Sequence, residues 1–485
     1  MSTRGDWAGA PVPRHGRPSP ARVTLAAAAL LAAILCQVAG CAGGNPETGP
    51  RRGLPIVLLG VDGLEWDVVL PLRARGRLPN LSALMARGVA GTLDTLTPTL
   101  SPVVWTTVAT GKTSAKHGIP HFALQRPDGA IRLFTSADRR TAALWNVLSE
   151  HGRRVAVVGW WMTYPVERVN GVMVAQTNTV AQVDTRAGRQ VWKGTLVTGV
   201  PDQVYPAERQ GEMLAMLEQV ERELPRLTAR IFGEGTVPRT ELGRRLWDNC
   251  RWAFRADATY ARIALAVARE RPGFDALLLY LGGPDVVGHR FWRYMRPDLY
   301  RHPPAPEEAA SLGGVIDDYY VYVDEILGEL MAAVGSTATI LVVSDHGMQP
   351  VNQGARFDPD APPADINSGH HLDAPPGVFI AAGPLIRAPA ALGRDAPSDV
   401  ARSGLPRIGS VLDITPTILA MLGIPVGLDM DGVVLRDVLV DVQQPPPIAT
   451  HDTPAFLAAR TQGKRPQDPA EQERIEQLRN LGYLR

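Results

Sequence analysis

The sequence has 485 residues, of which 45% are hydrophobic and 20% are charged, a composition typical of a folded globular protein. Its 50 Lys and Arg residues against 49 Asp and Glu residues give a formal net charge of +1. A protein that binds nucleic acid polymers is expected to carry a basic excess that neutralises phosphates. The charge balance therefore argues against that class, and equally against an acidic solvating protein.

The N-terminal segment has the pattern of a secretory signal. Four arginines in residues 1–22 precede an uncharged apolar run over residues 23–35, which is shorter than the ~20 residues of a membrane-spanning helix. The sequence Val-Ala-Gly-Cys that ends at Cys41 resembles the bacterial lipobox, in which the Cys is lipidated and begins the mature chain. We predict a lipoprotein signal peptide over residues 1–40 and a flexible tether over residues 41–53. A plain secretory signal or an uncleaved anchor is the alternative.

This signal predicts where the mature protein resides. A lipid on Cys41 would attach it to a bacterial membrane on the extracytoplasmic side, at the periplasmic or cell-surface face. Of the three Cys residues, Cys36 is lost with the signal and Cys41 is lipidated, so Cys250 alone remains. A single thiol excludes an internal disulfide bond.

Short apolar runs that end in acidic or Gly-rich residues recur through the rest of the chain, with helical patterns between them. The apolar runs cover residues 55–61, 154–159, 274–280, 337–343 and 377–382, and the helical patterns cover residues 78–87, 141–150 and 317–334. Runs that are apolar on both faces are typical of buried strands in a largely parallel sheet. The alternation predicts an α/β fold with helices on both faces of a central sheet, forming one catalytic domain over residues 54–440.

Two segments depart from this rhythm. In residues 165–245 the second half is amphipathic, with apolar residues at helical spacing. We interpret this segment as a cap-like insertion that covers one end of the sheet; an ordinary pair of surface helices is the alternative. Residues 441–485 are expected to form a polar, Pro-rich linker followed by a C-terminal helix.

Acidic residues and histidines cluster at the ends of the predicted strands. Asp62, Asp285 and the pair Asp345 and His346 follow apolar runs, and ligands in open α/β sheets bind at the carboxyl ends of the strands. Each residue alone has an ordinary explanation as a turn former or helix cap. Together they predict that these side chains meet at one rim of the sheet, at the carboxyl ends of the strands.

Two further histidines extend this set. His289 lies four residues after Asp285, so the two share a face if a helix begins there, and His371 precedes the run at 377–382. Three Asp and three His residues offer O and N ligands for two divalent ions, Zn²⁺ in the first place and Mn²⁺ as the other candidate. Two such ions can stabilise both the attacking and the leaving oxygen of an in-line displacement.

A candidate nucleophile precedes a helical pattern that ends at Gly111. Ser101 followed by Pro102 predicts a helix start with Ser101 as the N-cap, and a helix N-terminus favours a bound phosphate. Ser-Pro is also a common helix start without any catalytic role. A phosphate-binding P-loop is excluded because Thr106 stands where that motif needs Gly, and no G-x-S-x-G motif supports a serine hydrolase triad.

These residues fall into ordered blocks that resemble the alkaline phosphatase superfamily, most closely its type I phosphodiesterase/nucleotide pyrophosphatase branch. The blocks are Asp62-Gly63, Thr99-Leu100-Ser101, His117-Gly118-Ile119, Asp285-x-x-Gly288-His289, Ser344-Asp345-His346-Gly347 and Gly369-x-His371. The resemblance covers roughly residues 54–440.

The resemblance implies a role for each matching residue. Ser101 stands where the family has its Thr or Ser nucleophile, next to a metal ion that also activates it. The ligands of that ion would be Asp62, Asp345 and His346, and those of a second ion Asp285, His289 and His371. His370 is adjacent and remains the alternative to His371, although the family's Gly-x-His spacing favours His371. The implied activity is hydrolysis of a small-molecule, lipid or glycan phosphate ester through a phosphoserine intermediate.

Two departures bear on the substrate. Nucleotide pyrophosphatases place a phosphate-contacting Asn three residues after the His-Gly-Ile block, whereas this chain has Phe122. Residues 101–105 lack the pattern that sulfatases need for formylglycine. A phosphomonoesterase or a phospho-group transferase of the same superfamily is therefore the alternative enzyme, and a non-catalytic binding lipoprotein is the alternative outside enzymes.

Overall fold

The structure is a computed structural model of the chain, and it describes residues 54–125, 131–176, 181–184, 189–192, 201–233, 241–356, 367–388, 404–454, 456–457 and 475. The predicted signal peptide, Cys41, the tether and nearly all of the predicted C-terminal helix lie outside the described residues. Among the described residues, no helix is both long enough and apolar enough to cross a membrane.

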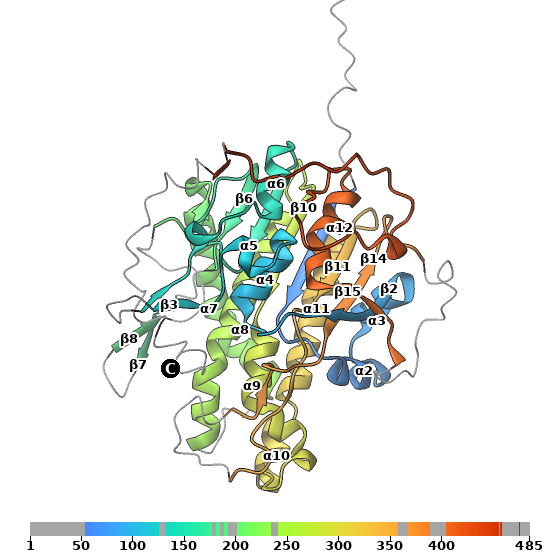
Figure 1. Ribbon diagram of the computed structural model, residues 1–485. Helices are drawn as coiled ribbons and strands as arrows, with labels where there is room; N and C mark the ends of the chain where they lie inside the picture. The colour runs from blue at the N-terminus through green and yellow to red at the C-terminus, as the bar shows by residue number, and fades with distance from the viewer. Residues whose placement is uncertain are drawn as a thin grey trace, which may run out of the picture. The chain divides into compact units, whose positions relative to one another are not determined.

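A nine-stranded sheet forms the centre of the fold, in the order β15-β2-β14-β11-β1-β10-β5-β6-β9 (Figure 1). Its strands are β1 (Ile56–Val61), β2 (Val89–Asp94), β5 (Val155–Val158), β6 (Gly171–Val174), β9 (Val204–Tyr205), β10 (Ala276–Leu281), β11 (Thr339–Val343), β14 (Gly377–Ala382) and β15 (Arg407–Ser410). Only β14 and β9 run against the other strands of this sheet. The expected largely parallel α/β sheet is confirmed.

Within the described residues, three two-stranded sheets accompany it. They pair β3 (Ala123–Gln125) with β4 (Ile131–Leu133), β7 (Ala181–Asp184) with β8 (Arg189–Trp192), and β12 (Gln349–Pro350) with β13 (Gly369–His370).

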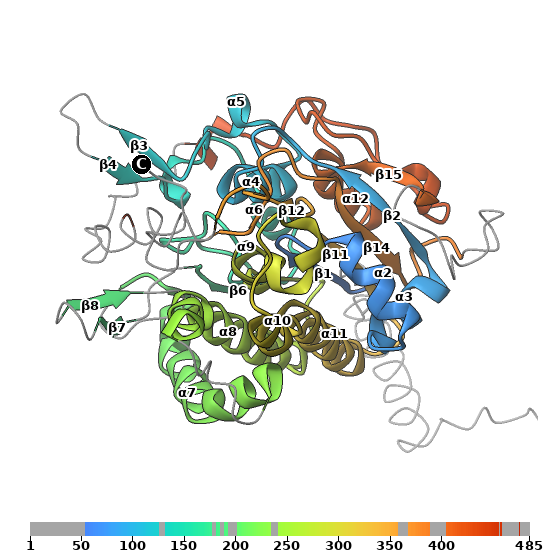
Figure 2. The same ribbon diagram turned by 90° about the horizontal axis from the view of Figure 1, so that it is seen from below.

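Helices cover both faces of the central sheet (Figure 2). They are α2 (Trp66–Ala74), α3 (Pro79–Arg87), α4 (Ser101–Thr110), α5 (Ser114–His117), α6 (Leu144–Glu150), α7 (Gln210–Phe232), α8 (Glu241–Ala268), α9 (Gly283–Met295), α10 (Pro306–Leu312), α11 (Val315–Val334) and α12 (Ile414–Met421). Because side chains alternate along a strand, β1 contributes Val57 and Leu59 to the core under α8, α9 and α11, and Ile56 and Leu58 to the core under α4, α6 and α12.

The described part of residues 165–245 contributes two strands to the central sheet and a helix to the layer that covers one of its faces. Strands β6 and β9 extend the sheet at one edge, and α7 packs beside α8. Met213, Leu217 and Val220 of α7 are buried, which explains the helical spacing of apolar residues in this part of the sequence.

A buried lysine joins α4 to the C-terminal part of the chain. Lys112, 2% exposed, follows α4, and its Nζ lies 2.5 Å from Asp429 Oδ2 and 2.7 Å from Asp452 Oδ2. Asp452 Oδ1 also accepts a hydrogen bond from the backbone N–H of Ala142. The segment that we expected to be a linker lacks helices and strands over residues 441–450 apart from a β-bridge between Ile448 and Gly427, and its Asp452 is part of the buried ion-pair network.

Candidate active site

Three neighbouring parallel strands, β11, β1 and β10, bring their carboxyl ends to one rim in the middle of the sheet. Asp62 follows β1 directly, Asp345 follows β11, and Asp285 lies in the first turn of α9 after β10. All three carboxylates are buried, with exposed fractions of 1%, 0% and 5%. A carboxylate is rarely buried unless it is paired or binds a metal ion.

His371 reaches the same rim for a different reason. Because β14 is antiparallel to β11, its first residues pair with the last residues of β11, as in the pair Phe379 and Val343. A residue that precedes β14 therefore lies at the carboxyl end of β11. If β14 were parallel to β11, the same residue would lie at the amino ends of the neighbouring strands.

Asp62, Asp345 and His346 form what we call the first cluster. His346 Nε2 lies 3.3 Å from Asp62 Oδ1 and 3.2 Å from Asp345 Oδ2. These three atoms are buried, and none of them makes a hydrogen bond with the part of the chain that the structure describes. Three buried ligand atoms that face one another without hydrogen bonds fit a metal ion, which would satisfy all three at once.

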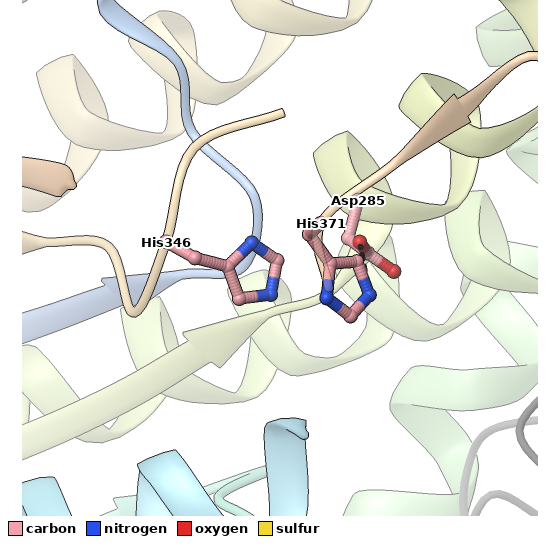
Figure 3. A group of neighbouring side chains, drawn as sticks. All are labelled: Asp285, His346 and His371. Atoms are coloured by element: carbon pink, nitrogen blue, oxygen red, sulfur yellow. Dashed lines mark ion pairs between the residues drawn. The ribbon is translucent and has the colours of Figure 1, made fainter. Parts of the chain in front are cut away.

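Asp285, His289 and His371 form the second cluster. Asp285 Oδ1 lies 3.4 Å from His289 Nε2 and 3.6 Å from His371 Nε2. The rings of His371 and His346 stack with their centroids 4.0 Å apart, and Asp285 lies beside His371 (Figure 3). Ligand atoms of Asp285, His346 and His371 lie within 4.8 Å of one another, so the two clusters adjoin.

The Nδ1 atom of each histidine in the two clusters has a polar partner. His289 Nδ1 lies 2.9 Å from the carbonyl oxygen of Gly369, His346 Nδ1 lies 2.9 Å from that of Gly347, and His371 Nδ1 lies 3.4 Å from the Thr99 hydroxyl. The carbonyl oxygens of Gly369 and Gly347 accept, so Nδ1 of His289 and of His346 carries a proton, and Nε2 is the ring nitrogen that faces the cluster. This is the arrangement that histidine ligands of metal ions adopt.

The electrostatics of the first cluster favour a cation. Burial and the neighbouring charge of Asp62 raise the pKa of Asp345 well above its usual value. Burial opposes the charged form of His346, but the carboxylates of Asp345 and Asp62 outweigh it and raise the pKa of His346 to about 10. Both shifts reflect the excess of negative charge within this buried cluster, which a divalent ion would neutralise.

The histidines of the second cluster are neutral at neutral pH. Burial, together with the charge of Arg290, lowers the pKa of His289 to about 3. Burial and the neighbouring His346 and His289 hold the pKa of His371 well below its usual value. A neutral imidazole is the form that binds a metal ion.

Ser101 is 3% exposed, and residues on both sides of it in the chain contact the two clusters. Two residues before it, the Thr99 hydroxyl donates a hydrogen bond to the carbonyl oxygen of His371. One helical turn after it, Trp105 Nε1 donates to Asp62 Oδ2 at 3.0 Å, and residues four apart share a helix face. Contacts on both sides of Ser101 thus bring this end of α4 to the two clusters.

The start of α4 differs by one position from our expectation. Leu100 is the N-cap, with φ −104° and ψ 120°, and Ser101 is the first helical residue. Gly111 ends the helix in the left-handed conformation, as the sequence predicts. In this first turn Pro102 has no backbone N–H group, and those of Val103 and Val104 donate to the carbonyl oxygen of Leu100.

The structure also places the two positions that the sequence left open. His370 is part of β13, is half-buried, and lies 3.4 Å from Gln349 through its Nε2, outside both clusters. Phe122 is 2% exposed and packs in an apolar cluster with Leu100 and Val103. Its ring meets that of Trp161 edge to face at a centroid distance of 5.6 Å.

Sequence reasoning missed several residues that support the site. Glu65 is 1% exposed; its Oε2 accepts from the backbone N–H of Met348 and its Oε1 from that of Asp67. Trp105 and Tyr280 both donate to Asp62. Nothing in the apolar run that contains Tyr280 distinguishes this residue from an ordinary core residue.

A family model described as type I phosphodiesterase/nucleotide pyrophosphatase matches residues 56–395. The chain belongs to this family. It is therefore a metal-dependent hydrolase of phosphoric esters within the alkaline phosphatase superfamily.

Solved structures with a similar fold were also found. Murine ectonucleotide pyrophosphatase/phosphodiesterase 5, in an inactive form in complex with AMP, is 12% identical with a TM-score of 0.44, and covers 80% of this chain and 100% of that chain. The human protein of the same name is 13% identical with a TM-score of 0.45 and the same coverage. Phosphonoacetate hydrolase from Sinorhizobium meliloti is 20% identical with a TM-score of 0.37, and covers 61% of this chain and 57% of that chain. No curated protein matches the chain.

Proposed function

We propose that the protein cleaves a phosphodiester or pyrophosphate bond with Ser101 as the nucleophile and two divalent ions, Zn²⁺ with Mn²⁺ as the other candidate, at the two clusters. The observation that carries the proposal is the first cluster. Its three buried ligand atoms face one another without hydrogen bonds within the described part of the chain, next to the helix that begins with Ser101.

Each cluster would hold one ion. Asp62, Asp345 and His346 supply two oxygens and one nitrogen, and Asp285, His289 and His371 supply one oxygen and two nitrogens. Such mixed O and N sets suit Zn²⁺. When bound, the ions stabilise negative charge on the nucleophile and on the phosphate oxygens.

The remaining chemistry belongs to the chain itself. The positive end of the α4 dipole, at Ser101, favours a phosphate group in front of the Ser101 hydroxyl. The Ser101 oxygen forms a bond to phosphorus while the ester oxygen departs and takes up a proton. Water then attacks the phosphoserine, releasing the phosphate product and restoring the hydroxyl of Ser101.

Membrane attachment is a further part of the proposal. The lipobox-like sequence ending at Cys41 supports a lipid anchor and a location on the extracytoplasmic side of a bacterial membrane. The substrate is then a small-molecule, lipid or glycan phosphate ester that is accessible at that face.

Substitution of the nucleophile tests the reaction. We expect wild-type protein to contain zinc by elemental analysis and to hydrolyse bis-p-nitrophenyl phosphate. Ser101→Ala should abolish turnover and keep its zinc, whereas Ser311→Ala, at an exposed position on α10, should match wild type. A wild-type protein without metal and without activity on any aryl phosphate ester would refute the proposal.

Phe122 favours a second candidate, a phosphomonoesterase or a phospho-group transferase. Nucleotide pyrophosphatases have Asn at this position, whereas Phe122 lies in an apolar cluster with Leu100 and Val103. The ratio of kcat/KM for bis-p-nitrophenyl phosphate to that for p-nitrophenyl phosphate separates the two activities. We expect a ratio above 1, and expect Phe122→Asn to change it more than Phe134→Asn does.

A further inference from the structure

The carboxylate of Asp62 has two oxygens with different surroundings. Oδ1 faces His346 Nε2 at 3.3 Å. Oδ2 accepts two hydrogen bonds, from the Tyr280 hydroxyl at 2.6 Å and from Trp105 Nε1 at 3.0 Å. The carboxylate therefore cannot rotate without breaking both bonds, and it presents Oδ1 to the first cluster.

The two donors are themselves held rigidly by aromatic packing. The rings of Trp105 and Tyr280 meet edge to face at 5.2 Å, and those of Trp105 and Trp160 at 5.1 Å. Trp160 Nε1 also donates to the backbone carbonyl oxygen of Trp105 at 3.2 Å. All three aromatic side chains are at most 5% exposed.

Gly60 leaves the room that this packing needs. A Cβ at Gly60 would lie 2.6 Å from a ring atom of Trp105, closer than van der Waals contact allows. Tyr280 pairs with Gly60 in the register of β10 and β1. The indole therefore lies directly against the backbone of the strand that ends at Asp62.

The donors come from two different elements. Tyr280 belongs to β10, whereas Trp105 belongs to α4 and lies one turn after Ser101. The hydrogen bond from Trp105 to Asp62 thus links the helix that begins with Ser101 to one of the proposed metal ligands of the first cluster. A shift of α4 would move the nucleophile and the carboxylate together.

We propose that Trp105 and Tyr280 are positioning residues that orient Asp62 for metal binding, and that Trp105 also fixes the distance between the Ser101 helix and the first cluster. This inference rests on the proposed function. Partners of this kind behind a metal ligand typically change metal affinity about 10–100-fold when removed.

The alternative is that both donors only satisfy a buried carboxylate and stabilise the fold. The two roles differ in what they affect. If the donors only stabilise the fold, removing them lowers the melting temperature of the metal-free protein. If they position Asp62, removing them lowers the affinity for one of the two ions and lowers kcat with little change in KM.

The experiment uses full-length protein and zinc alone as the probe. Tyr280→Phe and Trp105→Phe each remove one donor and keep an aromatic ring. Zinc affinity is measured by competition with a chromophoric chelator, and the melting temperature of each metal-free variant is recorded. Tyr294→Phe is the matched control, because the buried Tyr294 hydroxyl makes no hydrogen bond within the described part of the chain.

We expect Tyr280→Phe to weaken binding of one zinc ion about 10–100-fold, to leave the second ion in place, and to reduce kcat while KM stays within about twofold. Tyr294→Phe should behave as wild type. Unchanged affinity for both ions in the double variant Tyr280→Phe, Trp105→Phe would overturn the inference, as would a loss of stability without a selective loss of metal.

The outcome separates this inference from the proposed function. Wild-type protein that binds two zinc ions and hydrolyses the diester upholds the proposed function, whatever the variants do. Variants that keep both ions then refute only the positioning role. Wild-type protein that binds no zinc refutes both.

Discussion

The two halves of the candidate metal centre are built in different ways. In the first cluster, Asp62 directly follows β1 and Asp345 lies two residues after the adjacent parallel strand β11, and the three residues of the cluster are at most 1% exposed. In the second cluster, Asp285 and His289 lie on α9 and His371 precedes an antiparallel strand, with exposed fractions from 1% to 6%. The sheet brings the residues of the first cluster together, whereas the second cluster needs α9 and the segment before β14 to meet.

This difference predicts how each half responds to substitution. The ligands of the first cluster are held by the sheet and by side chains behind them, so a change there disturbs the metal more than the fold. The second cluster depends on β13, where a Cβ at Gly369 would lie 2.4 Å from the carbonyl oxygen of Gly288. Close backbone contact and the Thr99 hydroxyl, which bonds to His371, together support this cluster.

The largest effect is expected for Asp345→Asn. This change removes a carboxylate charge from the first cluster, and we expect zinc affinity and kcat/KM both to fall by more than the roughly 100-fold that loss of an outer partner causes. Elemental analysis and diester turnover measure it. Full zinc content in Asp345→Asn would show that the first cluster is not a metal site.

His371→Ala should affect the second ion only. We expect loss of one zinc ion per chain and a fall in kcat of about 100-fold or more, because one of three ligands is removed. The neighbouring His370→Ala provides a matched control and should keep both ions and full activity. If His370→Ala loses the ion and His371→Ala does not, the assignment of the two histidines is reversed.

Gly63→Ala tests how closely the two clusters are coupled. Gly63 has φ +66°, and a Cβ there would lie 2.9 Å from Asp285 Cα. We expect a loss of about 2–4 kcal/mol in the free energy of unfolding, and weaker zinc binding, because Asp285 must move. Gly76 has φ +69°, but a Cβ there would have no atom within 4 Å. Gly76→Ala should therefore lower the free energy of unfolding by only about 1 kcal/mol. Equal losses in urea unfolding of the two variants would contradict the steric coupling.

The smallest effect is expected for Thr99→Val, which keeps the shape of the side chain and removes its hydroxyl. Thr99 bonds to the carbonyl oxygen of His371 and lies 3.4 Å from its Nδ1. We expect zinc affinity at the second cluster to fall about 10-fold, with recovery in Thr99→Ser. A fall that Thr99→Ser does not reverse would point to packing instead of the hydroxyl.

The sequence predicts the first cluster better than its surroundings. Asp62 and Asp345 follow long apolar runs, and the rule that ligands bind at strand ends brings them together. The bonds that orient Asp62 join residues 43 and 218 positions apart, and no local pattern reports such contacts. Spacing therefore identifies the ligands but not which oxygen of Asp62 faces the metal.

His371 shows a second limit. The apolar run of β14 is buried on both faces, so its pattern does not distinguish a parallel from an antiparallel strand. Only the antiparallel direction brings a residue before this strand to the rim. Strand β2 was also not predicted, because its burial alternates and its residues include Gly91.

The buried Lys112 has a consequence for the order in which the protein forms. Its partners Asp429 and Asp452 follow 317 and 340 residues later in the chain. An ammonium group buried without a counter-charge costs several kcal/mol, so Lys112 cannot reach its native position before those carboxylates have been synthesised. The helix that begins with Ser101 therefore depends on the C-terminal part of the chain for its native position, although the two are far apart in the sequence.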